Sequence, residues 1–174
     1  LFPYTTLFRS FLEAARMMKI KHSRDVFFVM VSYLPIPSKV GEMKTKPTQS
    51  AVRALNTYGI QPDFIIGRSE VPLDKKRKEK IGISCSVQPD RVISAPDIES
   101  IYEVPLNFEK DKFAEQLMEL LQIKGKKNPK EIKAWQNFVT IWNKTVLGRF
   151  NEKLSWEHGL VFFGAITQPI HQLG

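Results

Sequence analysis

An almost unbroken apolar run, DVFFVMVSYL at residues 25–34, constrains the fold more than any other feature. A run rich in β-branched and aromatic residues is typical of a strand buried on both faces, as in a parallel sheet. Pro35 and Pro37 follow the run and end the strand. Two shorter apolar segments, DFIIG at residues 63–67 and RVIS at residues 91–94, predict further buried strands.

Segments with helical periodicity separate these strands. Strands that alternate with helices indicate an α/β domain with a mainly parallel sheet. We also expect a loop at residues 38–46, an extended piece at 101–104 just before Pro105, and a basic linker at 124–130. Apolar spacing predicts the end of a helix at residues 11–21 and further helices over four ranges: residues 47–58, 73–85, 109–121 and 131–144.

Composition narrows the class of protein and its partners. The 26 lysines and arginines exceed the 18 acidic residues, giving a net charge of +8, which favours an anionic partner. No apolar run approaches the roughly 20 residues that span a bilayer, and residues 1–10 lack the pattern of a signal peptide. The single cysteine, Cys85, excludes an internal disulfide and fits a reducing cytoplasm. The three histidines are scattered, so we predict no metal site: His22, His158 and His171.

A loop with two lysines precedes the second predicted helix. It reads GEMKTKPTQ at residues 41–49, and Lys44 and Lys46 stand just ahead of Pro47, which suits the first turn of a helix. Free N–H groups and the helix dipole favour an anion at such an end, and ammonium groups suit phosphate. The pattern therefore indicates either a polyphosphate site or a solvated basic loop that caps the helix. Three further residues add neutral hydrogen-bonding groups: Thr45, Thr48 and Gln49.

Several segments closely resemble successive segments of the CTP synthase family, in order and with nearly the expected spacing. The similarity runs from about residue 11 to about residue 144. The segments are FLEA at 11–14, GEMKTKPTQ at 41–49, GIQPDFIIGRSE at 59–70 and DIESIYEVPL at 97–106.

The resemblance implies the ATP-dependent amidoligase domain of that family, a three-layer, P-loop-type (Rossmann-like) α/β fold with a mainly parallel sheet, here incomplete. In the family's reaction UTP becomes CTP. ATP phosphorylates the 4-oxygen of uracil, and ammonia derived from glutamine displaces the phosphate. The family uses ATP and Mg²⁺ and assembles as a homotetramer.

Carried over position by position, the resemblance implies two nucleotide sites. UTP, and CTP as a feedback inhibitor, would bind Lys44, Thr45, Lys46, Pro47, Thr48, Gln49 and Lys80. ATP would lie near Arg68 and near Pro96, Asp97 and Ile98, the last three mainly through their backbone.

Each of these residues also has an ordinary structural interpretation. Lys80 resembles the solvated lysines beside it, and Arg68 could form an ion pair with Glu70. Pro96 and Asp97 suit a plain turn. Cys85 is interpreted as a small buried hydrophobe rather than a nucleophile.

Several parts of the family's machinery have no counterpart in the sequence. Phosphoryl transfer needs a phosphate cradle and magnesium ligands, yet no G-x-x-x-x-G-K-[ST] segment occurs. The glutaminase nucleophile, histidine and acid are also missing, so no catalytic residue is predicted and we expect the chain to be inactive alone.

The resemblance also predicts the boundaries. Residues 1–10, LFPYTTLFRS, resemble a translated sequencing adapter and are left out of the fold prediction. Residues 11–123 correspond to part of the amidoligase domain, and residues 124–144 to a linker and helix leading toward a glutaminase domain. Residues 145–174 match nothing in the family and are interpreted as the product of a frameshift or an assembly error.

A basic nucleic-acid-binding module is the main alternative, with residues 75–80 and 124–130 contacting phosphates. Such modules usually offer a docking motif or exposed stacking aromatics, and the sequence shows neither. Nothing argues for a third possibility, a non-catalytic interaction domain. The ordered resemblance favours the enzyme family, with UTP, CTP and ATP as ligands and no nucleic acid or membrane as partner.

Overall fold

The computed structural model describes residues 3–38, 41–125 and 128–147. It divides into two compact units, Leu1–Lys126 and Lys127–Gly174. The second unit is described only by helix α6 (Pro129–Trp142) and the π-helical turn Asn143–Leu147 that follows it. Most of the unmatched segment, residues 148–174, therefore lies outside the described residues.

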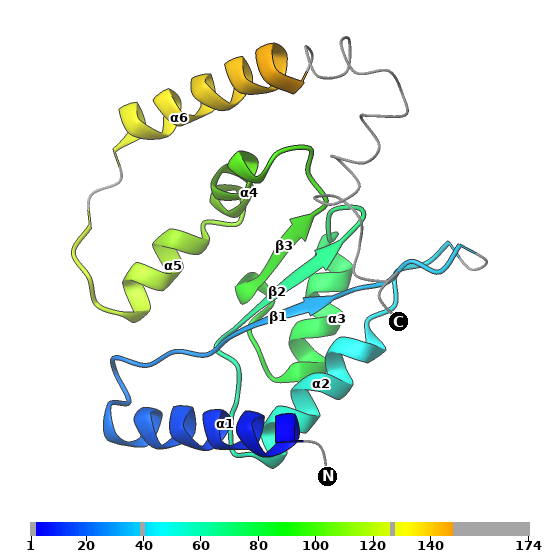
Figure 1. The fold of residues 1–174 in the computed structure, drawn as a ribbon, viewed down its shortest axis with the longest axis vertical. Coiled ribbons are helices and arrows are strands. Elements are labelled where there is room, and N and C mark those ends of the chain that lie inside the picture. Colours follow the sequence, from blue (N-terminus) through cyan, green and yellow to red (C-terminus); the bar gives the residue numbers. More distant parts are fainter. Residues whose placement is uncertain (1–2, 39–40, 126–127, 148–174) are drawn as a thin grey trace. The chain divides into compact units, whose positions relative to one another are not determined.

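A three-stranded parallel sheet lies at the centre of the first unit (Figure 1). Its strands are β1 (Val29–Tyr33), β2 (Phe64–Ser69) and β3 (Val92–Pro96), in the order β1-β2-β3. Each lies within or next to one of the three apolar runs, as expected for strands with few polar side chains. The predicted α/β class with a parallel sheet is confirmed.

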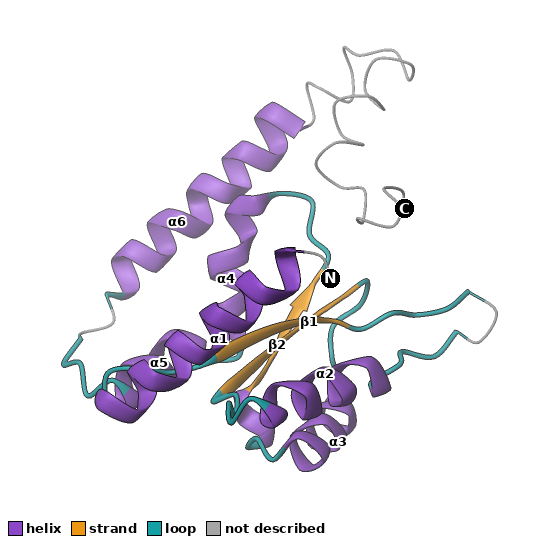
Figure 2. Cartoon of the chain, turned by 60° about the horizontal axis from the view of Figure 1, so that its bottom comes forward, coloured by secondary structure: helices purple, strands orange, loops and turns teal. Residues whose placement is uncertain are grey.

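Helices cover both faces of the sheet. Helices α2 (Lys46–Thr57) and α3 (Lys75–Cys85) lie side by side on one face, as Figure 2 shows. Side chains of α4 (Val104–Lys110) and α5 (Phe113–Leu120) pack on the other face. The first unit thus has the three layers that were predicted. Helix α1 (Pro3–Lys21) precedes β1, and short 3₁₀ helices span Pro89–Arg91 and Ile101–Glu103.

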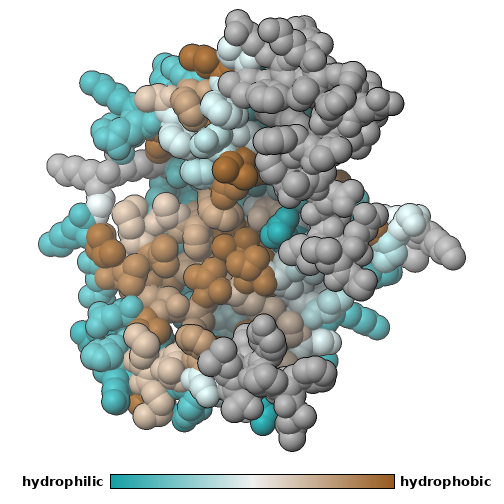
Figure 3. All heavy atoms as spheres, in the orientation of Figure 1, coloured by the Kyte–Doolittle hydropathy of each residue, from teal (hydrophilic) through white to brown (hydrophobic). Residues whose placement is uncertain are grey.

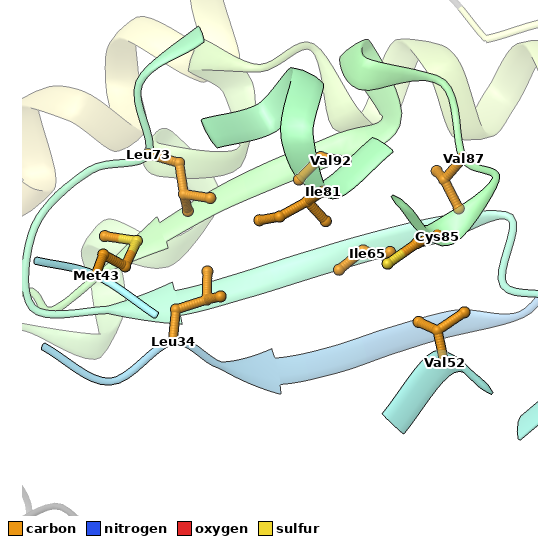
Figure 4. Close-up of a cluster of buried hydrophobic side chains, with 9 residues drawn as sticks. All are labelled: Leu34, Met43, Val52, Ile65, Leu73, Ile81, Cys85, Val87 and Val92. Atoms are coloured by element: carbon orange, nitrogen blue, oxygen red, sulfur yellow. The ribbon is translucent and has the colours of Figure 1, made fainter. Parts of the chain in front are cut away.

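Alternating side chains of the strands build two separate cores. Ile65 and Val92 point toward α2 and α3, where they pack with Val52 and Ile81 (Figure 4). The intervening residues point to the opposite face, because successive side chains of a strand alternate. There Phe64, Ile66 and Ile93 are packed by four residues of α4 and α5: Phe108, Phe113, Leu117 and Leu120.

Two predicted elements were wrong in extent or type. Helix α1 (Pro3–Lys21) is not one of them: it ends at Lys21 as predicted, and it begins within the segment that was left out of the fold prediction. Residues 101–104 are not extended. The Ser100 hydroxyl accepts a hydrogen bond from the Tyr102 N–H, and Pro105 suits the first turn of α4. The single helix predicted at 109–121 is two helices, α4 and α5, broken near Lys112.

Candidate functional site

The predicted binding residues, apart from Lys80 on α3, lie at the edge where the parallel strands end. The segment after β1 leads into residues 44–49, Arg68 is the penultimate residue of β2, and Pro96 ends β3. In the sheet register Arg68 pairs with Tyr33 on one side, and Ser69 pairs with Pro96 on the other. Ligands of α/β proteins usually bind at this edge, so its side chains are the natural place to build a site.

The loop before α2 alternates between buried and displayed side chains. Met43 and Thr45 are buried, whereas Lys44 is half-buried and Lys46 is exposed. Figure 4 shows Met43 directed toward Leu34 and Leu73. This alternation anchors the loop to the core while leaving both ammonium groups accessible from solvent.

Backbone hydrogen bonds fix the same loop. The Lys44 N–H donates to the Pro35 carbonyl at 2.8 Å, and the Gly41 N–H donates to the Pro37 carbonyl at 2.9 Å. Gly41 has φ of +63°, a conformation that glycine adopts at low cost. The Lys44 ammonium lies 3.8 Å from the Glu42 carboxylate, an exposed contact that an anion could displace at small cost.

The neutral polar side chains of this segment form hydrogen bonds within the protein. Thr48 is fully buried, and its Oγ1 lies 2.8 Å from the Oγ of Ser32 on β1. Gln49 donates from Nε2 to Thr45 Oγ1 at 3.1 Å. Two hydroxyls predicted to meet a nucleotide therefore already have protein partners.

The first turn of α2 still favours an anion. Thr45 precedes the helix but its side chain makes no capping hydrogen bond, and the next residues are Lys46 and Pro47. The helix dipole and the uncapped N–H groups at this end attract negative charge. Among residues 44–49, Lys46 and Pro47 are exposed and Lys44 is half-buried, whereas Thr45 and Thr48 are buried.

The residues predicted to meet ATP also lie together. Arg68 and Asp97 face each other across β2 and the end of β3, with 3.8 Å between guanidinium and carboxylate. Both side chains are more than half exposed, at 57% and 56%. Arg68 thus pairs with Asp97 and not with Glu70, the partner considered from sequence. The Asp97 N–H donates to the Ser69 carbonyl at 2.8 Å, so this backbone group is not free for a ligand.

The lysines of α3 look alike in the sequence but differ in the structure. Lys78 is largely buried and donates to the Asp111 carboxylate at 2.6 Å, and Asp111 also accepts from the Ser94 N–H at 2.7 Å. Lys80 is exposed, as are Lys75 and Lys76. Within the described residues no hydrogen bond or ion pair joins Lys80 to residues 44–49, although α2 and α3 are neighbours.

Sequence reasoning missed three residues that organise this edge: Ser32, Ser94 and Asp111. A serine inside an apolar strand was the available signal for Ser32, because a buried hydroxyl must find a partner. Asp111 carried no such signal. Its partners are 17 and 33 positions away in the chain, at Ser94 and Lys78.

Cys85 behaves as its structural interpretation predicts. Cys85, the last residue of α3, is buried in the core, and burial raises the pKa of its thiol, an effect that the charge of Arg53 opposes. A buried thiol with a raised pKa is a poor nucleophile, which confirms the interpretation as a hydrophobe. Among the described residues, no group of three or more His, Cys, Asp or Glu side chains could hold a metal ion. No described helix combines the length and apolar character needed to cross a bilayer.

Comparison with known proteins gives one consistent family. A family profile described as "CTP synthase N-terminus" matches residues 8–123. The chain is 44% identical over 130 residues to a CTP synthase of Pyrococcus furiosus, a match that covers 74% of this chain and 24% of that protein. It is 44% identical over 133 residues to a CTP synthase of Bdellovibrio bacteriovorus, covering 75% of this chain and 24% of the relative. A CTP synthase of Methanococcus aeolicus is 40% identical over 130 residues, with coverages of 74% and 24%. The chain thus spans about a quarter of the length of these curated relatives.

Proposed function

Because this chain belongs to the CTP synthase family, we propose that it forms part of the synthetase domain of an enzyme that aminates UTP to CTP. In this proposal residues 11–123 carry nucleotide-binding groups, and residues 124–144 lead toward a glutaminase domain that supplies ammonia. The complete enzyme would be a homotetramer of the cytoplasm, with UTP, CTP and ATP as its ligands.

The observation that carries the proposal is the pair of lysines at the start of α2. Lys44 and Lys46 are held outward by buried neighbours on a loop that ends at an uncapped helix N-terminus. Two ammonium groups beside free N–H groups suit the triphosphate of UTP or of CTP. Pro47 and the exposed Lys80 would line the same site. Thr45, Thr48 and Gln49 would act by shaping it, since their side chains bond within the protein.

The second nucleotide would lie at the same edge of the sheet. Arg68 on β2 and Asp97, the first residue after β3, present an exposed cation and an exposed carboxylate next to Pro96 and Ile98. We propose that this surface meets ATP, with Arg68 leaving Asp97 for a phosphate. Transfer of a phosphoryl group to the uracil oxygen requires the two nucleotides to lie close together, and a shared edge allows this.

Magnesium would neutralise the developing phosphate charge when bound. The described residues offer no carboxylate cluster for it, so we assign its ligands to parts of the relatives that this chain does not span. We likewise assign the phosphate cradle and the glutaminase residues to those parts. The role left to this chain is to bind and orient nucleotides.

Equilibrium binding of UTP to the 174-residue chain tests the proposal. We expect Lys46→Ala to weaken UTP binding at least about tenfold, because a charge-assisted contact to phosphate is lost. Lys110→Ala is the matched control, since Lys110 is exposed on α4 and belongs to no predicted site. Equal losses in both variants, with a steep salt dependence for any polyanion, would instead favour the basic nucleic-acid-binding module.

A further inference from the structure

Ser32 is a polar residue in a strand made almost entirely of apolar ones. It lies on β1 in register with Gly67 of β2, and its side chain points toward the layer that contains α2. There its Oγ meets the Oγ1 of Thr48 at 2.8 Å. No predicted nucleotide contact includes Ser32.

The hydrogen bond between Ser32 and Thr48 joins β1 to α2. Thr48 is fully buried, and a buried hydroxyl without a partner is costly, so the two side chains hold each other in one arrangement. Thr48 belongs to the first turn of α2, two residues after Lys46. Through this bond Ser32 holds the first turn of α2 at the carboxyl edge of the sheet. The position of that turn determines where the Lys46 side chain starts.

The rest of the lysine loop is anchored elsewhere. Met43 packs into the core with Leu34 and Leu73, and the Lys44 N–H bonds to Pro35. The contact between Ser32 and Thr48 acts on Lys46 from the helix side, and within α2 it lies nearer to Lys46 than the buried Val52 does. Arg68 and Asp97 are held by other contacts, through β2 and the segment after β3.

We propose that Ser32 is a positioning residue for the pyrimidine nucleotide, acting through Thr48 to place the first turn of α2. The inference rests on the proposed function and deepens it. It makes the Thr48 hydroxyl an anchor rather than a ligand, and it separates the determinants of UTP binding from those of ATP binding.

The test compares dissociation constants for UTP and for ATP in the 174-residue chain and in four single variants and one double variant. Ser32→Ala and Thr48→Val each remove one hydroxyl of the pair, and we expect each to weaken UTP binding roughly threefold to tenfold, as for one buried hydrogen bond. ATP binding should stay unchanged. Ser32→Thr restores a hydroxyl on β1 and should recover most of the UTP affinity. Ser50→Ala removes an exposed hydroxyl from the same helix and should change neither constant.

The double variant Ser32→Ala/Thr48→Val gives the sharpest result. If Ser32 acts through Thr48, the double variant loses no more UTP affinity than either single variant. Additive losses, or equal losses for UTP and ATP, overturn the inference while leaving the proposed function standing. A wild-type chain that binds ATP but not UTP overturns the assignment of the pyrimidine site, and the inference with it. Thermal melting of each variant shows whether it is folded. If Ser32→Ala does not fold, the UTP affinities of Ser32→Thr and Thr48→Val test the inference in its place.

Discussion

Lys112 has a backbone conformation that residues other than glycine rarely adopt. Its φ of 53° and ψ of 33° are left-handed, and it stands at the break between α4 and α5. A non-glycine residue pays roughly 1–2 kcal/mol for this conformation, whereas glycine adopts it freely. We expect Lys112→Gly to raise the free energy of unfolding by about 1 kcal/mol, measured by urea denaturation.

Glu79→Gly provides the matched control for Lys112→Gly. Glu79 is exposed in the middle of α3, where a glycine only adds conformational freedom to the unfolded chain. We expect Glu79→Gly to lower the free energy of unfolding by about 1 kcal/mol. Opposite signs for the two variants identify the left-handed backbone as the cause. A loss of stability at both positions would mean that Lys112 relaxes its strain through contacts of its side chain.

Single residues also show the limit of prediction from sequence. The two lysines ahead of Pro47 were recognisable, because the charge and the helix start are local features of the chain. The family resemblance implied that Thr45 and Thr48 contact the nucleotide, yet both hydroxyls bond inside the protein. Only the fold decides which side of the loop faces inward, and Ser32 is brought to Thr48 by tertiary packing.

At the scale of elements, Asp111 joins three of them. Its carboxylate accepts from Lys78 on α3 and from the N–H of Ser94 on β3, and it stands between α4 and α5. The side chains of Lys78 and Asp111 are only 17% and 19% exposed, so solvent compensates little if the pair is broken. This contact holds a helix of one face of the sheet to the junction of two helices on the other.

Removing the Asp111 carboxylate should therefore destabilise the whole first unit. We expect Asp111→Ala to lower the free energy of unfolding by about 2–4 kcal/mol, because Lys78 and the Ser94 N–H both lose their partner. Asp111→Asn keeps an oxygen for Ser94 and should lose about half as much. Glu13→Gln, in an exposed ion pair with Arg16 on α1, should leave the denaturation midpoint unchanged. Equal effects of Asp111→Ala and Glu13→Gln would show that the buried contacts of Asp111 stabilise the fold no more than an exposed ion pair does.

The elements themselves were largely predictable, and the errors have physical causes. The apolar runs located all three strands because strands of a parallel sheet are buried on both faces. The pattern could not show the break at Lys112, since the helical spacing of Phe113 and Leu117 continues from α4. It also misjudged residues 101–104, where Ile101 and Val104 favour a strand by themselves but Ser100 and Pro105 start a helix.

At the scale of the whole molecule, β1 leaves apolar surface uncovered. Within the described residues its outer edge pairs with no strand, and Val31 is 60% exposed. Val29 and Val31 share the face of Phe64 and Ile66, which α4 and α5 cover farther along the sheet. Figure 3 shows apolar side chains gathered on one face of the molecule. An unpaired apolar edge is a template for pairing with other chains.

We therefore expect the 174-residue chain to self-associate as its concentration rises, despite a net charge of +8. Val31→Lys places a charge on the outer strand, where natural proteins use lysine against edge pairing, and should shift the chain toward monomer in sedimentation velocity. Ile83→Lys adds the same charge at an 80% exposed position on α3, which is a helix and not part of the sheet edge. If both variants reduce association equally, added charge is the cause. If Val31→Lys alone restores the monomer, the chains associate through β1. A charge at Val31 lies on the apolar face of β1 and beside its unpaired hydrogen-bonding edge, so it disfavours both kinds of contact.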